Sequence, residues 1–544
     1  LNFGYKPAGI PLDRDDPTRI NAADGFLDPR FGVYEGCADG SPDRPGGRTV
    51  SGGNVCAGDA LANIVPGART IDYDYTPNRE LEETSFYVSI DWEVAEHSVM
   101  VNGAMFDYQS INLMDADLSG LASWVDGNYS TSKSKQVDVT VSSLFDGPLQ
   151  YTVGAYYFNS QDPDNRSAYI FGSLVESWSG YAGATPETPS WASWNSEGRG
   201  GTKSTALYGQ ATYALTDKLN MTAGIRFTED DREAQSADPL SFDNSAARLG
   251  PTLPIRTYGT REVQKGVDKN TDYRLGADYQ VGENLMVYAT YATAYIAGAT
   301  DVTTQTLLAP QTNKAFEIGA KSTLLDGALR LNAAAYSGKF EGLTTTAFIE
   351  QGDTGISVAT QVPGGSILSR GLEIEGFWDV TDALVVDFGV SIDMSQYDEF
   401  IVDAGNLVWN DTAPIGAETI SGSFVYVVDG EDTPYTPDVT VGVGVSYFID
   451  LGDMGTIKPH VFAYYNSGYV SNRAPVFFAD QDAYTKLDLS VKWQSTDGDY
   501  SVQAYVNNAS DELIKTYTEI FSRARVAYDY NSPRNFGVRF AYNF

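Results

Sequence analysis

The sequence has few histidines, few cysteines and no long apolar run. Its purely apolar segments are far shorter than the roughly 20 residues that a membrane-spanning helix needs, so any membrane crossing must be made by strands. Lys and Arg number 36 against 72 Asp and Glu, which gives a formal net charge of −36. A chain this acidic repels nucleic acid, and we do not expect it to bind DNA or RNA.

The scarcity of histidine bears on enzymatic function. The two histidines are His97, at a predicted turn, and His460, in the middle of a predicted strand. Neither has an obvious Ser or Cys partner, whereas hydrolase triads and transition-metal sites need several groups that converge on one point. The sequence therefore predicts that the protein is not an enzyme.

The two cysteines, Cys37 and Cys56, lie close together in a stretch rich in Gly, Asp and Pro. They indicate a disulfide-closed loop in an oxidising compartment, with two free loop thiols as the alternative. The chain begins at Leu1 without a charged and then apolar leader. We therefore expect a signal peptide to have been removed or to lie outside this stretch.

Alternation of apolar and polar residues with a period of two dominates the sequence. In residues 535–544, one face carries Phe, Val, Phe, Tyr and Phe, and the other carries Asn, Gly, Arg, Ala and Asn. The same pattern recurs at 439–447, 487–493 and 372–379. Such segments fit the roughly 9 to 11 residues with which a tilted strand crosses a bilayer, one face toward lipid and the other toward water or protein.

About seventeen strands are predicted in this way. They span residues 81–94, 97–113, 133–145, 149–161, 203–216, 219–231, 268–281, 285–298, 313–325, 328–345, 367–380, 383–396, 438–450, 455–469, 483–495, 499–513 and 534–544. Short turns, such as 146–148 and 216–218, alternate with long polar loops near 162–202, 230–265, 397–437 and 512–533. This lopsided layout predicts an all-β, transmembrane antiparallel β-barrel with short periplasmic turns and long extracellular loops.

Several segments on the predicted strands resemble the barrels of TonB-dependent receptors. In chain order they are 206–213 (ALYGQATY), 222–230 (TAGIRFTED), 316–321 (FEIGAK), 325–336 (LDGALRLNAAAY), 369–376 (SRGLEIEG), 506–512 (VNNASDE) and 533–544 (PRNFGVRFAYNF). Each segment alone is weak evidence for the family. Their occurrence in the same order, in a resemblance that extends over residues 81–544, is specific for it. The last segment resembles the family's final strand, whose terminal aromatic residue, here Phe544, is a signal for the barrel assembly machinery.

The resemblance does not extend to the family's plug domain or to its TonB-engaging segment. Seventeen is an odd number, whereas bacterial single-chain barrels have an even number of strands. Five more strands before Leu1 would give the 22 of plugged outer-membrane transporters. We therefore expect 1–80 to be an extracellular loop region, 81–544 to be the C-terminal portion of the barrel, and the plug to lie upstream. The alternative is a barrel that lacks a plug and cannot be energised.

Charged residues recur on the polar face of the predicted strands. They are Asp91, Glu93, Arg226, Asp272, Arg274, Asp278, Glu317, Lys321, Glu373, Glu375, Lys486, Lys492 and Arg539. A charge against lipid is expensive, so these side chains should face a wet lumen or a polar plug. Arg226, Arg274, Glu373, Glu375, Lys486 and Arg539 are candidates for holding or releasing the plug. The alternative is the ordinary hydrogen bonding of a water-filled wall.

Aromatic residues gather on one predicted outer loop. They are Trp178, Tyr181, Trp191 and Trp194. Exposed rings of this kind can stack on a flat ligand or a sugar, although packing of the loop on itself or on the barrel rim is an equal alternative. Three other tryptophans, Trp92, Trp378 and Trp493, are predicted to belong to the interfacial girdle.

The predicted function is TonB-dependent import of a scarce nutrient across the outer membrane of a Gram-negative bacterium. By resemblance, the ligand is most often a ferric siderophore. Oligosaccharide or cobalamin uptake remains an alternative, and the scarcity of histidine disfavours haem. No cofactor is predicted, although the acidic runs at 13–16 and 229–231 could hold structural Ca²⁺ instead of being solvated charge. The sequence is also compatible with a passive structural, adhesin or porin-like barrel, or with a soluble all-β protein.

Overall fold

The computed structural model describes residues 3–5, 78–115, 124–171, 192–237, 263–301, 306–350, 357–403, 418–420, 423–473, 479–522 and 525–543. Nearly all of these residues lie in strands, and seventeen of the described strands are long. They are β2 (Asn78–Val94), β3 (His97–Asp115), β4 (Trp124–Ser143), β5 (Leu149–Phe171), β6 (Ala192–Thr216), β7 (Leu219–Ala237), β8 (Val263–Gly282), β9 (Leu285–Ile296), β12 (Gln311–Leu324), β13 (Leu329–Glu350), β14 (Ser357–Asp379), β15 (Leu384–Asp393), β20 (Val439–Tyr447), β22 (Thr456–Val470), β23 (Asp480–Gln494), β24 (Tyr500–Asn507) and β27 (Asn535–Tyr542).

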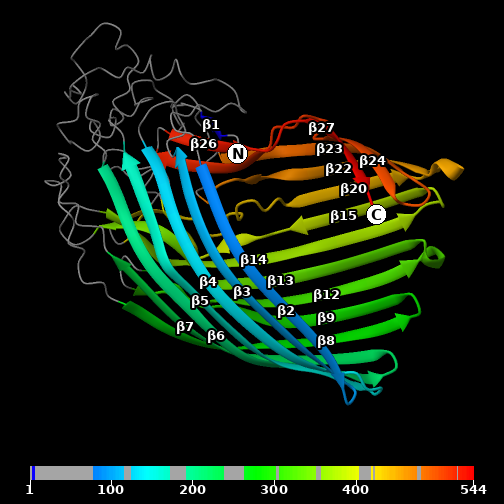
Figure 1. Cartoon of the computed structure of the whole chain (residues 1–544), viewed down its shortest axis with the longest axis horizontal. Helices are drawn as coiled ribbons and strands as arrows, with labels where there is room; N and C mark the ends of the chain where they lie inside the picture. Colours follow the sequence, from blue (N-terminus) through cyan, green and yellow to red (C-terminus); the bar gives the residue numbers. More distant parts are fainter. Residues whose placement is uncertain are drawn as a thin grey trace, which may run out of the picture.

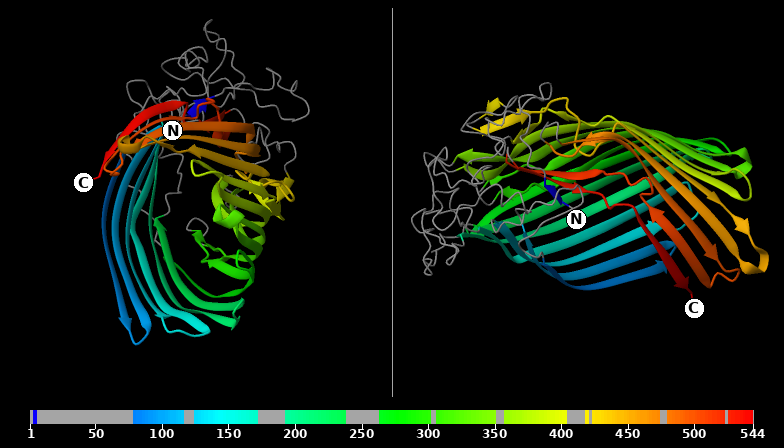
Figure 2. Two further views of the ribbon diagram at one scale, coloured as in Figure 1. Left: turned by 90° about the vertical axis from the view of Figure 1, so that its right-hand side faces the viewer. Right: turned by 90° about the horizontal axis from the view of Figure 1, so that it is seen from above.

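The long strands form one antiparallel sheet that curls into a barrel (Figures 1 and 2). Each strand pairs with the next long strand along the chain, from β2 with β3 to β24 with β27. The short strands β16 (Gln396–Asp398) and β21 (Ile449–Asp450) join the same sheet. The predicted fold class is therefore confirmed, including the seventeen long strands.

The outer face of the barrel is apolar. Leu207 of β6 lies opposite Phe227 of β7, and their side chains are 64% and 53% exposed. Side chains of this size cost free energy in contact with water, so a continuous face of them requires lipid. Trp92, Trp378 and Trp493 each lie close to a short turn, as expected for the interfacial girdle. Within the described residues, no helix has the length and apolarity for a membrane span.

Several strands are longer than the sequence predicts. β5 continues to Phe171, β6 begins at Ala192, β7 continues to Ala237 and β14 begins at Ser357. The predicted loops near 162–202 and 230–265 are therefore too long. Beyond the bilayer both faces of a strand meet water, so the period-two contrast that marks a strand in the sequence disappears.

The extracellular end carries small sheets that the sequence presents as irregular loops. Strands β17 (Ile401–Asp403), β18 (Glu418–Ile420) and β19 (Ser423–Val427) form one, and β1 (Phe3–Tyr5), β25 (Lys515–Ser522) and β26 (Arg525–Tyr530) form another. A two-stranded ribbon consists of β10 (Thr300–Asp301) and β11 (Thr306–Leu307). Tyr397 and Phe400 have ring centroids 4.6 Å apart and are buried with Val425 and Val428, which gives this end an apolar core of its own.

Candidate transport lumen

The inner wall of the barrel carries the polar side chains. Along β14, Leu372 is exposed on the outer face, and the neighbouring Glu373 and Glu375 occupy the opposite face. There they lie opposite Ala334 and Asn332 of β13. Because successive side chains of a strand point to opposite faces, every charge in phase with these two glutamates lines the lumen.

The structure places the six lumen candidates on strands, in phase with the inner face. They are Arg226 (β7), Arg274 (β8), Glu373 and Glu375 (β14), Lys486 (β23) and Arg539 (β27). Arg274, Glu373, Glu375 and Arg539 are exposed, as expected for a wall that faces water or a separate polar body. Their role in holding or releasing a plug stays a prediction.

Tyrosines laid over glycines are a recurring feature of this wall, which the sequence did not reveal. The ring of Tyr288 (β9) covers Gly319 (β12), where an added Cβ would lie 2.6 Å from the ring, and its hydroxyl donates to Glu317 at 2.6 Å. Tyr336 likewise covers Gly371 and donates to Asp393 at 2.5 Å. Each unit donates one hydrogen bond to a wall carboxylate and fixes a large ring flat against the sheet.

A third unit of this kind contains one of the predicted residues. Tyr208 covers Gly154 and donates to Asp138 at 2.8 Å. The guanidinium of Arg226 lies 5.3 Å from the ring centroid of Tyr208 and 5.5 Å from that of Tyr156. A guanidinium held between two rings is attracted by both π faces, so the structure gives Arg226 a fixed position on the wall.

The most buried charges of the wall lie near the extracellular ends of β7 and β8. Arg232 forms an ion pair with Asp268, and the two side chains are 9% and 14% exposed. Asp268 also accepts the backbone N–H of Gly298 at 3.1 Å, and the buried Asp230 accepts the hydroxyl of Tyr295 at 2.9 Å. The bond to Gly298 ties the segment after β9 to the wall, since Gly298 lies beyond the end of that strand, whereas Tyr295 belongs to β9 itself.

On the side of the lumen opposite β7 and β8, basic residues line the periplasmic part of the wall. Lys458 of β22 lies opposite Lys492 of β23, and Arg539 of β27 lies two strands from Lys492 in register. Nearby, Lys486 forms an ion pair with Asp488 at 3.2 Å. The periplasmic part of the wall of β22–β27 is therefore basic, whereas Asp480, Asp482 and Asp488 lie on the same face of β23 nearer its extracellular end. On the wall of β12–β15, the acidic residues outnumber the basic residues Lys321 and Arg330; they are Glu317, Glu373, Glu375, Asp387 and Asp393.

The structure corrects one expectation about the histidines. His460 does have a serine partner, because its Nδ1 lies 2.9 Å from Oγ of the buried Ser446 on the adjacent strand. Antiparallel register brings the two residues together, although they are distant along the chain. His97 contacts the Tyr151 hydroxyl at 2.7 Å. In the described part of the chain, no cluster of His, Cys, Asp or Glu could hold a metal ion.

Several predicted residues lie outside the described part of the chain. These are Cys37 and Cys56, the aromatic residues Trp178, Tyr181 and Trp191, the terminal Phe544, and the acidic run 13–16. Trp194 is not in a loop as predicted, because its backbone belongs to β6 and pairs with Tyr169. The acidic run 229–231 is also on a strand, so its carboxylates alternate between the two faces of the sheet. On the outer face, Glu229 forms an ion pair with Lys269 at 2.9 Å, whereas Asp230 faces the lumen.

In the described part of the chain outside the membrane-spanning strands, Tyr528 has a strongly raised pKa. Burial raises the pKa of Tyr528 in β26 to about 12, with a smaller contribution from Tyr530. The ammonium of Lys515 lies 4.8 Å from the centre of the Tyr528 ring. The extracellular sheet of β1, β25 and β26 therefore buries a neutral phenol at its centre.

Comparison with known proteins agrees with this architecture. A family model described as "TonB dependent receptor-like, beta-barrel" matches residues 25–509. The ferric yersiniabactin uptake receptor FyuA from Yersinia pestis superposes with a TM-score of 0.65 at 17% identity, over 86% of this chain and 62% of that one. The siderophore receptor PiuA from Acinetobacter baumannii has a TM-score of 0.60 at 15% identity, over 83% and 64%.

The pyoverdine receptor FpvA from Pseudomonas aeruginosa has a TM-score of 0.59 at 15% identity, and the match covers 88% of this chain and 64% of that one. The chain thus spans a little under two thirds of the length of these receptors. At sequence identities of 15–17%, the superpositions establish only the fold. The family model matches most of the chain and therefore establishes the family. The chain belongs to the TonB-dependent receptors of the Gram-negative outer membrane.

Proposed function

We propose that this protein imports a ferric siderophore across the outer membrane, with energy that TonB delivers through a plug domain. The observation that carries the proposal is the family match over residues 25–509, joined to a barrel whose inner wall is polar. Siderophore recognition by the superposed receptors FyuA, PiuA and FpvA supports the choice of ligand class. The ligand would enter from the extracellular end.

The geometry of the lumen supports a gated path better than an open pore. The acidic wall of β12–β15 and the basic periplasmic part of the wall of β22–β27 could hold a polar body by hydrogen bonds and ion pairs on both sides. Contacts of this kind are screened by water and can be exchanged, unlike a packed apolar interface. A plug held in this way could be shifted by a pull from the periplasm without unfolding the barrel.

Iron-transport assays in the native host test the proposal. Deletion of the gene that encodes this chain should abolish uptake of one class of ⁵⁵Fe-loaded siderophore under iron limitation, and expression in trans should restore it. Loss of TonB or collapse of the proton-motive force should have the same effect as the deletion. Unchanged uptake of every ferric siderophore tested would refute the ligand class.

Competing functions give different results in the same strains. Loss of labelled cobalamin or oligosaccharide uptake would keep the TonB-dependent mechanism and replace the ligand. Uptake that persists without TonB would indicate a passive, porin-like barrel. Wild-type transport of every solute, with altered attachment of cells to surfaces, would favour an adhesin.

A further inference from the structure

Two tyrosines face the lumen near the extracellular ends of β22 and β23. Tyr464 of β22 lies opposite Lys486 of β23, and its neighbour Tyr465 is exposed on the outer face. Tyr484 is two residues from Lys486 and therefore on the same face of β23. The ring centroids of Tyr464 and Tyr484 are 6.2 Å apart, and the ring planes form an angle of 50°. The pair thus presents two inclined rings to the lumen instead of a closed parallel stack.

A buried amide holds this pair in place. Asn466 lies opposite Tyr484 in register and is only 3% exposed. Its amide nitrogen donates to the hydroxyl of Tyr464 at 3.4 Å, and its oxygen accepts the backbone N–H of Gly468 at 2.8 Å. Because these bonds fix the position of Tyr464 in advance, a ligand loses little free energy in ordering the ring.

An exposed carboxylate stands beside the two rings. Asp482 lies two residues beyond Tyr484, toward the extracellular end and on the same face of β23. The residue opposite Asp482 is Gly468, which has no side chain to cover the carboxylate. Among the residues that the structure describes, the Asp482 side chain has no ion-pair partner. Its negative charge is therefore available to a cation from outside the described chain.

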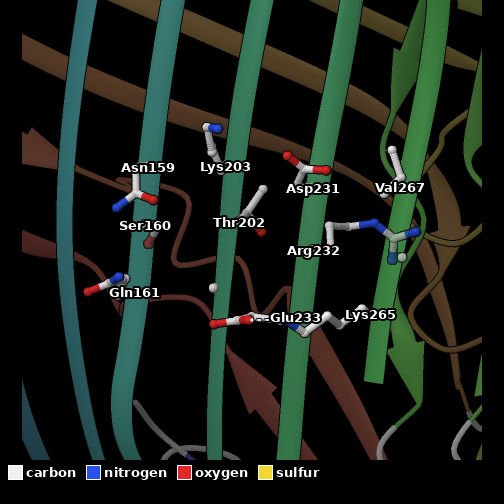
Figure 3. A pocket seen from close by; sticks show the side chains of 12 residues that line it. Asn159, Ser160, Gln161, Thr202, Lys203, Asp231, Arg232, Glu233, Lys265 and Val267 are labelled. Carbon is white, nitrogen blue, oxygen red and sulfur yellow. Dashed lines mark ion pairs between the residues drawn. The ribbon is translucent and has the colours of Figure 1, made fainter. Parts of the chain in front are cut away.

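The basic side chains at this level of the lumen already have partners. Lys486 forms its ion pair with Asp488 at 3.2 Å, and the ammonium of Lys515 donates to the backbone carbonyl of Asp480 at 2.7 Å. On the other side of the lumen, Arg232 extends from β7 toward β8 (Figure 3), where it forms the buried ion pair described above. An anionic ligand would therefore have to break an existing contact at each of these cations.

Inclined rings beside a carboxylate are suited to an organic cation, because the face of an aromatic ring carries negative potential. The wall already contains such contacts. Arg226 lies between two tyrosine rings, and the ammonium of Lys321 lies 5.8 Å from the centroid of the Tyr288 ring. In those units the chain supplies the cation, whereas no cation of the described chain lies over the ring pair of β22 and β23.

The charge of the chain limits the rest of the ligand. The net charge is −36, and Asp480 and Asp482 both lie on the lumen face of β23 near its extracellular end. A ferric tris-catecholate is trianionic and is repelled by this field. Hydroxamates neutralise Fe³⁺ in a tris-hydroxamate, so the charge of such a complex is that of its substituents alone.

We propose that Tyr464, Tyr484 and Asp482 bind an ammonium group on the imported complex, and that this complex is a ferric tris-hydroxamate with a cationic substituent. The ammonium lies against the two ring faces and donates to the carboxylate, while the neutral iron centre stays toward the middle of the lumen. The inference rests on the proposed siderophore import and names the substrate class for it.

The test compares two ligands that differ by one charge. Ferrioxamine B is a linear ferric tris-hydroxamate with a terminal ammonium group, and acetylation of that amine gives a neutral complex with the same iron centre. Binding to the full-length protein from outer membranes is measured by quenching of its tryptophan fluorescence. The wild type should prefer the ammonium form by about 5-fold or more, since the ring pair and the carboxylate each contribute about two- to five-fold.

Variants separate the rings from the carboxylate. D482N and Y464L/Y484L should each lower this preference to about two-fold, whereas Y464F/Y484F keeps the rings and should retain it. The matched control E83Q removes another exposed carboxylate, on the lumen face of β2, and should leave the preference unchanged. Folding of each variant is checked by its heat-dependent gel mobility.

The outcomes distinguish the substrate class from the transport function. Equal affinity of the wild type for the two complexes would overturn the proposal, as would equal losses of preference in D482N and E83Q. Tighter binding of a ferric tris-catecholate than of either hydroxamate would also overturn it, and siderophore import would stand. If no ferric complex binds or is taken up, import itself is refuted, and the substrate class falls with it.

Discussion

Substitution of Val443 by Arg places a charge on the lipid face near the middle of the membrane. Val443 lies on β20 between Phe388 and Ala463 of the adjacent strands, in phase with the exposed Val445 and Tyr447. Tyr447 marks the periplasmic edge of the apolar band. At about 3.3 Å per residue and a tilt of about 45°, Val443 is roughly 9 Å above that edge, near the centre of a band about 25 Å tall.

The expected cost follows from this depth. Arginine at the midplane of a barrel's lipid face destabilises it by about 2–4 kcal/mol, which corresponds to a factor of roughly 30 to 900 in the folding equilibrium. The matched control is Thr440→Arg on the same strand, where the side chain faces the lumen beside Asn466 and should cost under about 1 kcal/mol. Tyr447→Arg, at the edge of the band, should fall between the two.

Urea unfolding of the protein in lipid vesicles, followed by tryptophan fluorescence, measures these differences. If Val443→Arg is no more destabilising than Thr440→Arg, the assignment of the outer face to lipid is wrong. The same result would support a soluble all-β protein, in which Val443→Arg is an ordinary surface change.

Three further predictions concern the inner wall and the extracellular end. Arg232→Gln leaves the carboxylate of Asp268 buried without its cation and should destabilise the barrel by about 3 kcal/mol. Adding Asp268→Asn to the same chain should restore part of this stability. If urea unfolding shows no recovery in the double variant, the ion pair is contradicted. Gly319→Val should displace the ring of Tyr288 and cost about 1–3 kcal/mol by the same assay, whereas a neutral result would mean that the ring is not fixed. The pKa of Tyr528 in the folded protein is raised to about 12, so the contribution of this phenol to stability is complete below pH 10 and is lost as the pH rises toward 12. An absorbance titration in which Tyr528 ionises near pH 10 would refute its burial.

Much of the barrel could be predicted from the sequence because the bilayer imposes a strong pattern on it. The alternating segment Val439–Tyr447 forms strand β20, and the short turn at 216–218 separates β6 from β7, both as predicted. The pattern fades where β5 and β6 leave the membrane, since water wets both faces there. For this reason the sequence around Trp194 resembles a loop, although the backbone of Trp194 pairs with Tyr169.

The candidate lumen was predictable in its polarity but not in its contacts. A charge in phase with the polar face must point inward, which places Arg226 and Glu373 without knowledge of the fold. The partners of these charges depend on the register between strands, which one sequence does not specify. Thus Tyr208 and Tyr156 around Arg226, and Ser446 beside His460, could not be found by reading along the chain.

Residue-by-residue accessibility along β7 tests the central claim, that one wall separates lipid from a wet lumen. Spin labels at positions 222–227 of the protein in bilayers would be probed with oxygen, which is soluble in lipid, and with a water-soluble nickel chelate. We predict oxygen contact at Ala223, Ile225 and Phe227, and chelate contact at Thr222, Gly224 and Arg226, with a period of two. Equal chelate contact at all six positions would contradict the barrel's placement in the membrane.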